Sequence, residues 1–242
     1  MNIKVNLNKA IEQLDGGKPQ DLDKPRIEIE ETLACHDVGR DNMRKWLART
    51  NENAYLQNSD FIHSLQFWLG EEHASYLHND LSQYGAKVST ELEAHAAEND
   101  LRFNNPRIDP YNGIGERIDK VVHHPSYTAA GDIIYGSDVV ARLVKTGGLR
   151  EGMGFYYLSC HGGEAGHTCP VICNFETARL LRKLDDFPER NEYIAKLEAP
   201  SYTENFTSSQ FLTEVQGGSD VGANGTRAWC DDGGVWRIRG EK

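Results

Sequence analysis

The spacing of apolar residues predicts helices over most of the chain. Between residues 59 and 101, apolar side chains recur mostly at steps of three and four, with polar side chains between them. Gly70 and Gly85 are expected to divide this stretch into two or three helices. The same kind of pattern predicts further helices at residues 41–48, 139–144, 153–160, 170–184 and 192–197.

Residues that favour helix ends and turns punctuate these segments. Ser137 is expected to cap the helix at 139–144, which Gly147 and Gly148 close. Thr168 is expected to cap the next helical zone, with Pro170 in its first turn. Residues 103–115 are predicted to form a loop, and the polar first 60 residues are predicted to turn at 16–19 and 23–25.

The pattern becomes strand-like from residue 208 onward. Short runs at 211–213, 227–230 and 235–238 are rich in residues typical of strands, and the sequence Asp-Asp-Gly-Gly at 231–234 predicts a hairpin turn between the last two. We therefore predict a mainly α protein. Residues 1–207 would form a helical domain with an irregular lead-in, and residues 208–242 would begin a β-domain.

Composition narrows the class of protein. Lys and Arg number 26 against 37 Asp and Glu, which gives a net charge of −11 and no general electrostatic footprint for nucleic acid or anionic lipid. No apolar run reaches the roughly 18 residues of a membrane span, and no secretory signal is visible at the start. An odd number of scattered cysteines is typical of reduced thiols, so we expect a cytoplasmic protein.

Residues 160–173 gather five side chains that are able to bind a metal. They are Cys160, His161, His167, Cys169 and Cys173. Structural zinc sites usually carry closely paired Cys-x-x-Cys or His knuckles, whereas the only close pair in this cluster is Cys169 and Cys173, with three residues between them. The pattern favours small buried thiols near a helix start over a zinc site.

The segment 212–223 combines a strand end, the pair Thr213-Glu214 and a glycine-rich turn. It resembles the first signature of the acyl-CoA dehydrogenases, and it departs from that signature only at Phe211, where a small residue is usual. Paired glycines let a backbone approach a planar ligand closely, and hydroxyls or turning N–H groups bind flavin carbonyls or phosphates. An ordinary polar surface turn is the alternative.

This resemblance implies an N-terminal helical domain, the first strands of a β-barrel domain and FAD as cofactor. It implies that Ser219 also lies near the acyl-CoA substrate, and that Glu214 is a structural carboxylate. The catalytic base is unknown, because the family places it in a C-terminal half that no residue here matches. The cofactor contacts implied are Gln210, Phe211, Leu212, Thr213, Gly217, Gly218 and Ser219.

Two further segments resemble the AidB-like branch of the family, namely 117–127, which contains His123-His124-Pro125, and 166–170. The resemblance implies the N-terminal part of a flavin-dependent acyl-CoA dehydrogenase, inactive by itself. Its candidate partners are acyl-CoA, the missing C-terminal half or a complementary subunit, other copies of the chain and an electron-transfer flavoprotein.

Two alternative functions stay open at this point. One is a non-enzymatic AidB-like flavoprotein with a role in the stress response or an association with DNA. The other is a helical metal-binding protein that uses the cluster from Cys160 to Cys173.

Overall fold

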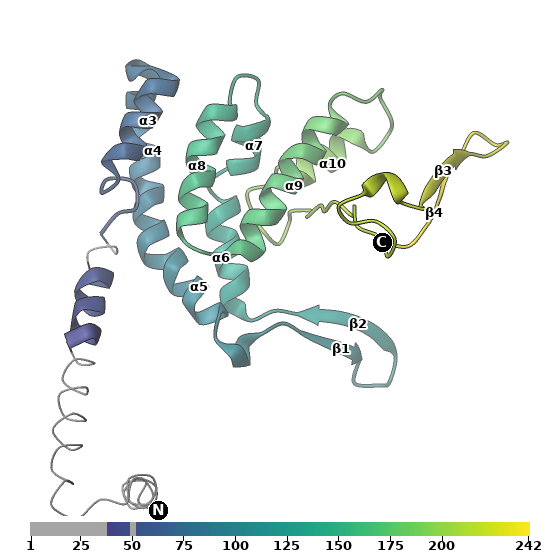
Figure 1. The fold of residues 1–242 in the computed structure, drawn as a ribbon, viewed down its shortest axis with the longest axis horizontal. Coiled ribbons are helices and arrows are strands. Elements are labelled where there is room, and N and C mark those ends of the chain that lie inside the picture. Colours follow the sequence, from purple (N-terminus) through teal and green to yellow (C-terminus); the bar gives the residue numbers. More distant parts are fainter. Residues whose placement is uncertain (1–37, 49–51) are drawn as a thin grey trace, which may run out of the picture. The chain divides into compact units, whose positions relative to one another are not determined.

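The computed structural model describes residues 38–48 and 52–242. They belong to two compact units, residues 1–51 and residues 52–242. In the first unit, residues 38–48 form a helix, which confirms the helix predicted at 41–48. The turns predicted at 16–19 and 23–25, and Cys35, lie outside the described residues. The second unit contains the elements labelled in Figure 1.

The long helical stretch at the start of the second unit is divided at Gly70, as predicted. Gly70 has a φ of 82°, a left-handed value that glycine adopts easily and that ends the first helix. The elements are α3 (Ser59–Leu69), α4 (Glu71–Lys87), a π-helical turn (Val88–Leu92) and α5 (Glu93–Asn99).

Gly85 does not interrupt α4, and the prediction of a break there is wrong. A Cβ atom at this position would lie 2.6 Å from Asn53 Oδ1 and 2.7 Å from Tyr55 Cβ. The backbone N–H of Ala54 donates to the Gly85 carbonyl over 3.1 Å. Glycine therefore serves close packing of another segment against the helix, and its low helix propensity is outweighed by that packing.

Five more helices complete the helical part of the described chain. The predicted helices near 139–144, 153–160, 170–184 and 192–197 are confirmed, and Gly147, with a φ of 76°, lies in the predicted turn. One helix is not predicted by the pattern, because small residues such as Ala130 and Gly131 form much of its buried face. The five are α6 (Pro125–Tyr135), α7 (Val139–Val144), α8 (Leu149–His161), α9 (Ala165–Leu181) and α10 (Arg190–Leu197).

Two predicted helix caps are wrong. Asp138, with a φ of 58°, is the residue before α7, while Ser137 donates its hydroxyl to the last turn of α6. Thr168 lies inside α9, which begins earlier because the Glu164 carboxylate accepts the Gly166 N–H over 3.0 Å. The Glu164 side chain, four residues before the predicted cap Thr168, thus satisfies one of the first N–H donors of α9.

Pro170 lies within α9, not in its first turn as predicted. Proline has no N–H, so it cannot make the usual hydrogen bond to the Gly166 carbonyl one turn earlier. The hydroxyl of Tyr127, from α6, donates to that carbonyl over 3.2 Å. The neighbouring helix replaces the missing bond, and α9 continues through the proline.

The core lies between α3, α4, α6, α7, α8 and α9 (Figure 1). Its largest fully buried side chains come from helices far apart in the sequence, among them Leu81, Tyr135, Leu143, Phe155 and His167. Burial of apolar side chains from many helices is the main source of the stability of such a fold. The three thiols at 160–173 do not join this core, because Cys160 and Cys169 are exposed and Cys173 is only half-buried.

Two antiparallel hairpins accompany the helices. β1 (Arg107–Tyr111) pairs with β2 (Arg117–Val122), so the prediction of a loop at 103–115 is wrong. Pro110 suggested a loop, but it lies where the register of the pair is irregular, a position at which a strand tolerates proline.

The second hairpin confirms the turn predicted at 231–234. β3 (Arg227–Cys230) pairs with β4 (Trp236–Arg239), and the Asp231 N–H donates to the Val235 carbonyl over 2.9 Å. Residues 211–213 are not part of a strand. The fold is mainly helical as predicted, and the domain boundary between residues 207 and 208 stays a prediction. In the part of the chain that the structure describes, no helix is long and apolar enough to cross a membrane.

Candidate functional site

The glycine-rich loop singled out in the sequence lies between α10 and β3. Its turn is closed by two backbone hydrogen bonds, from Glu214 N–H to the Gly217 carbonyl (2.8 Å) and from Gly217 N–H to the Glu214 carbonyl (3.2 Å). Glu214 and Gly217 are buried, while Val215, at the tip between them, is 98 % exposed. The loop therefore has an inside, which holds it together, and an outside, which is open to solvent.

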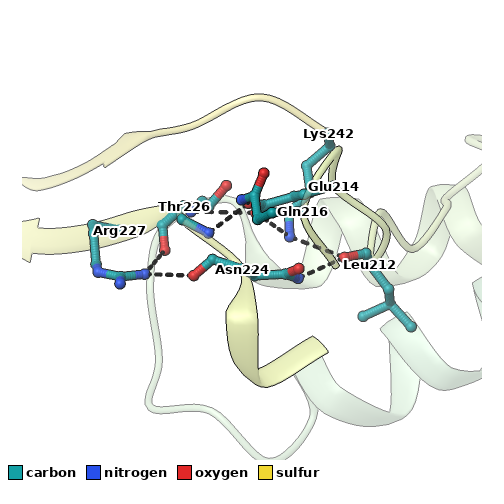
Figure 2. Close-up of polar contacts among 8 residues, drawn as sticks. Leu212, Glu214, Gln216, Asn224, Thr226, Arg227 and Lys242 are labelled. Atoms are coloured by element: carbon teal, nitrogen blue, oxygen red, sulfur yellow. Dashed lines mark hydrogen bonds and ion pairs between the residues drawn. The ribbon is translucent and has the colours of Figure 1, made fainter. Parts of the chain in front are cut away.

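The Glu214 carboxylate is the centre of the inside (Figure 2). It accepts hydrogen bonds from the backbone N–H of Gly225 (2.6 Å) and of Thr226 (3.2 Å) and from the Gln216 side-chain amide. The Lys242 ammonium lies 2.8 Å from Glu214 Oε1. One side chain thus joins the loop, the two residues before β3, and Lys242, which lies three residues after β4.

These partners also set the protonation state of Glu214. The Lys242 ammonium, chiefly, and the N–H donors lower the pKa of Glu214 to about 2. The side chain is 2 % exposed and its lone pairs are occupied. A carboxylate held in this way is a poor general base near neutral pH, and the hydrogen bonds confirm that Glu214 is a structural carboxylate.

A second contact holds the lead-in to the loop. The Asn224 side-chain amide donates to the Leu212 carbonyl over 2.6 Å, and the Lys242 ammonium donates to the same carbonyl over 3.2 Å (Figure 2). The guanidinium of Arg227 donates to the carbonyls of Asn224 and Thr226. The backbone before and after the turn is therefore fixed by side chains of the segment that follows it.

The two glycines of the turn have different surroundings. A Cβ atom on Gly217 would lie 2.6 Å from Asn224 Oδ1 and 2.6 Å from the Asp220 carbonyl, so no side chain fits there. A Cβ atom on Gly218 would meet only Thr213 Cγ2, at 3.9 Å. Gly217 is needed for the packing of the loop itself, whereas the backbone at Gly218 faces open space.

The structure places the predicted cofactor contacts on the outside of the loop, with one exception. Within the described residues, the hydroxyls of Thr213 and Ser219 form no hydrogen bond with the protein. Thr213 and Gly218 lie close together, and Gly217 is the buried exception. The exposed predicted contacts are Gln210, Phe211, Leu212, Thr213, Gly218 and Ser219.

The residues that hold this loop in shape are not predicted by the sequence pattern. Asn224 and Gly225 form an Asn-Gly pair, a common turn signal, and only this signal indicates a turn near these residues. Nothing in the spacing of Thr226 and Lys242 indicates that they meet Glu214, because their contacts depend on how β3 and β4 fold back, while Gln216 reaches Glu214 within the turn itself.

The cluster from Cys160 to Cys173 does not form a metal centre in the part of the chain that the structure describes. No group of three His, Cys, Asp or Glu side chains there is arranged to hold a metal ion. His167 is fully buried, and its Nε2 atom lies 2.7 Å from the Tyr127 carbonyl. The geometry therefore gives the metal-binding hypothesis no support.

Both segments that resemble the AidB-like branch meet at this histidine. His123 stacks on Tyr127 with ring centroids 4.1 Å apart, and Tyr127 stacks on His167 at 4.0 Å. His124 caps α6, so each of the two histidines makes a structural contact with α6.

Comparison with known protein families shows which family this chain belongs to. The N-terminal domain family of the adaptive response protein AidB matches residues 47–204, which is more than half of the chain. The chain belongs to this family. The match ends before the glycine-rich loop, so the family assignment rests on the helical part and on the first hairpin.

Two curated relatives extend the comparison beyond the AidB N-terminal domain. Acyl-CoA dehydrogenase family member 11 of Caenorhabditis elegans is 25 % identical over 205 residues, which cover 80 % of this chain and 32 % of the relative. The putative acyl-CoA dehydrogenase AidB of Escherichia coli K12 is 25 % identical over 204 residues, 79 % of this chain and 37 % of the relative. The chain spans about a third of the length of these relatives.

Solved structures show the same fold. The crystal structure of C. elegans ACDH-11 in complex with C11-CoA aligns with a TM-score of 0.66 at 22 % identity, over 78 % of this chain and 33 % of that one. The apo form of Bd2924 aligns with a TM-score of 0.64 at 20 % identity, over 74 % and 36 %. The AidB N-terminal domain described here therefore has the fold of the N-terminal part of acyl-CoA dehydrogenases, and it is a distant homologue of them.

Proposed function

We propose that this chain is the N-terminal part of a flavin-dependent acyl-CoA dehydrogenase. Membership of the AidB N-terminal family, and two relatives named as acyl-CoA dehydrogenases, support this assignment. The observation that carries it is that the loop has an internally hydrogen-bonded side and an open side. Glu214 satisfies the inside of the turn, which leaves Gly218 and the unbonded hydroxyls of Thr213 and Ser219 facing outward.

An open glycine beside two free hydroxyls suits a flat, polar cofactor. FAD, when bound, would accept the hydride removed from the β-carbon of the acyl thioester. Thr213 and Ser219 would donate to its carbonyl or phosphate oxygens, and Gly218 would allow the backbone to approach it. Ser219 would also lie near the acyl-CoA, the class of ligand named for the ACDH-11 complex.

The remaining catalytic groups would come from outside this chain. Glu214 is occupied by its hydrogen bonds, and no residue here matches the family's base. The chain also spans only about a third of its relatives. We therefore propose that removal of the α-proton depends on the part of an acyl-CoA dehydrogenase that lies beyond this third.

The second hairpin supports the proposal that further strands cover it. Trp236 and Ile238 on β4 are 71 % and 76 % exposed. A two-stranded hairpin is only marginally stable in water and usually needs more strands or a helix against it. A larger β-domain, as in a β-barrel, would bury these side chains.

A role in an adaptive response is the second candidate, favoured by the description of the matching family. The net charge of −11 argues against nucleic acid as a direct partner of this chain. Assembly with other copies, an electron-transfer flavoprotein as acceptor and a cytoplasmic location stay predictions.

The proposal is tested by completing the enzyme. The chain is fused to, or co-expressed with, the region of an acyl-CoA dehydrogenase beyond the matched third. Bound flavin is measured by absorbance, and turnover by reduction of a dye with acyl-CoA substrates. We expect flavin and turnover in the completed protein and no turnover in the 242-residue chain alone, because a missing base removes orders of magnitude of rate. Rapid dye reduction by the chain alone, or a completed protein that folds without flavin, would contradict the proposal.

A further inference from the structure

The segment that leads into the loop is held against α9. Residues 205–210 connect α10 to the loop, and the backbone N–H of Phe206 donates to the Lys196 carbonyl over 3.0 Å. Asn205 donates to the carbonyls of Leu197 and Ala199, and the hydrogen bonds from the Phe206 carbonyl onward go to three residues of α9, which are Cys173, Asn174 and Thr177. The loop thus leaves the helical part of the chain along one face of this helix.

Asn174 makes most of these contacts. Its side chain is fully buried and makes five hydrogen-bond contacts. The two hydrogens of the amide nitrogen are shared among the carbonyl of Leu197 (3.3 Å), Asn205 Oδ1 (2.9 Å) and the carbonyl of Phe206 (2.8 Å). The amide oxygen accepts the backbone N–H of Ser208 (2.8 Å) and its hydroxyl (3.0 Å).

The partners allow this amide only one orientation. The carbonyls of Leu197 and Phe206 can only accept, and the backbone N–H of Ser208 can only donate. A flipped amide would place its NH₂ group against the Ser208 N–H and its oxygen against two carbonyls. Since an unpaired buried polar group costs free energy, both Asn174 and the segment it binds are confined to one arrangement.

Two neighbours on α9 extend the same contact. Thr177, one turn or so further along the helix, donates its hydroxyl to Ser208 Oγ over 3.1 Å. The backbone N–H of Gln210 donates to the Cys173 thiol. Ser208 therefore lies between two side chains of α9, and Gln210, the first predicted cofactor contact, is tied to the same helix.

We propose that Asn174 is a positioning residue that sets where the glycine-rich loop leaves the helical part of the protein. Glu214 gives the loop its internal shape, whereas Asn174 and Ser208 determine its place relative to α9. The consequence for flavin binding rests on the function proposed above. The anchor itself does not, and it can be tested without flavin.

The test is amide hydrogen exchange on the 242-residue chain, read by mass spectrometry. Asn174→Ala leaves several buried groups unpaired and risks loss of the fold, so the main variant is Ser208→Ala. This change removes the hydroxyl shared by Asn174 and Thr177. We expect the amides of 206–210 to exchange about three- to tenfold faster, the range that follows from losing one or two hydrogen bonds.

Three controls separate an anchor from general stability. Ser208→Thr retains the hydroxyl and should restore slow exchange. Ser201→Ala removes an exposed serine hydroxyl that contacts only Thr203, and it should leave 206–210 unchanged. The peptides of α8 and of residues 214–226, which Glu214 holds, should exchange as in the wild type in all three variants.

Each outcome decides the proposal. Unchanged exchange at 206–210 in Ser208→Ala, or no protection there in the wild type, overturns the anchor. Equal acceleration throughout the chain also overturns it, because Ser208 would then support the fold in general.

A flavin titration of the completed enzyme tests the consequence separately. Ser208→Ala should weaken flavin binding about three- to tenfold at an unchanged melting temperature, and Ser208→Thr should restore it. Faster exchange with unchanged flavin affinity would leave the anchor in place and would count against the proposed flavin contact of the loop.

Discussion

The buried imidazole of His167 offers the most direct test of how this fold is held together. His167 from α9 lies between α6 and the segment after α10, stacked on Tyr127 and edge-on to Tyr202. Its Nε2 atom is 2.7 Å from the Tyr127 carbonyl. A Cβ atom on Gly131 would lie 2.7 Å from its Cε1 atom, so the ring is tightly enclosed.

Two substitutions separate the hydrogen bond from the packing. His167→Phe retains an aromatic ring but removes the side-chain donor to the Tyr127 carbonyl, which should reduce the free energy of unfolding by about 0.5–1.5 kcal/mol. His167→Ala also leaves a cavity, and large-to-small changes in a core cost about 2–5 kcal/mol. We therefore expect His167→Ala to be the less stable of the two.

Urea unfolding at pH 7.5, followed by circular dichroism, measures both changes. His161→Ala at the exposed end of α8 is the matched control and should stay within about 0.5 kcal/mol of the wild type. The reasoning fails if His167→Phe is as stable as the control, since the buried hydrogen bond would then contribute nothing measurable.

The same residue predicts a dependence on pH. Burial, above all, lowers the pKa of His167 below its ordinary value of 6.5. The folded state therefore binds this proton less readily than the unfolded state does. The contribution of His167 is fully present above pH 6.5 and is lost as pH falls below it. The Gln side chain in His167→Gln retains a donor but does not titrate. The free energy of unfolding of this variant should therefore change less below pH 6.5 than that of the wild type.

Three further predictions follow from close contacts and charge. Gly85→Ala should lower the free energy of unfolding by about 1–3 kcal/mol in urea, because the clash with Tyr55 exceeds the gain in helix propensity of about 1 kcal/mol; equal or higher stability would show that this contact relaxes freely. Gly217→Ala should speed amide exchange in residues 212–226 while Gly218→Ala leaves it unchanged, because a Cβ fits only at Gly218; equal effects would contradict the contrast between the two. The Lys242 ammonium and the hydrogen bonds lower the pKa of Glu214 to about 2, so the loop amides should be fully protected from exchange above pH 4.5 and should lose this protection as pH falls toward 2. In Glu214→Gln the loop amides should exchange rapidly already at neutral pH. A loop whose exchange responds to neither change would exclude the carboxylate as its centre.

Local chemistry was enough to predict several parts of this protein. Gly70 ends a helix because its left-handed φ is open mainly to glycine, and the run Asp231–Gly234 turns a hairpin for similar reasons. The loop at 212–223 was singled out by its resemblance to a family signature. In each case the residues that cause the feature are neighbours in the chain, so the sequence contains the whole cause.

Helix boundaries show where local chemistry was insufficient. Pro170 and Gly85 both favour the end of a helix, yet α9 and α4 continue through them. Tyr127 supplies the hydrogen bond that Pro170 cannot make, and the segment at 53–55 packs on the bare backbone of Gly85. These partners lie 30 to 43 residues away in the sequence, and no short window along the chain includes them.

The same distinction applies to the candidate site. The resemblance of the sequence to a family signature indicated which residues form the loop and implied a structural carboxylate in it. Only the tertiary structure decided that Glu214 meets Lys242, that Gly217 and Gly218 differ, and that Asn174 binds the segment before the loop. Hydrogen bonds between distant segments depend on how whole elements pack, because burial first brings the elements together and polar side chains are then paired where they meet.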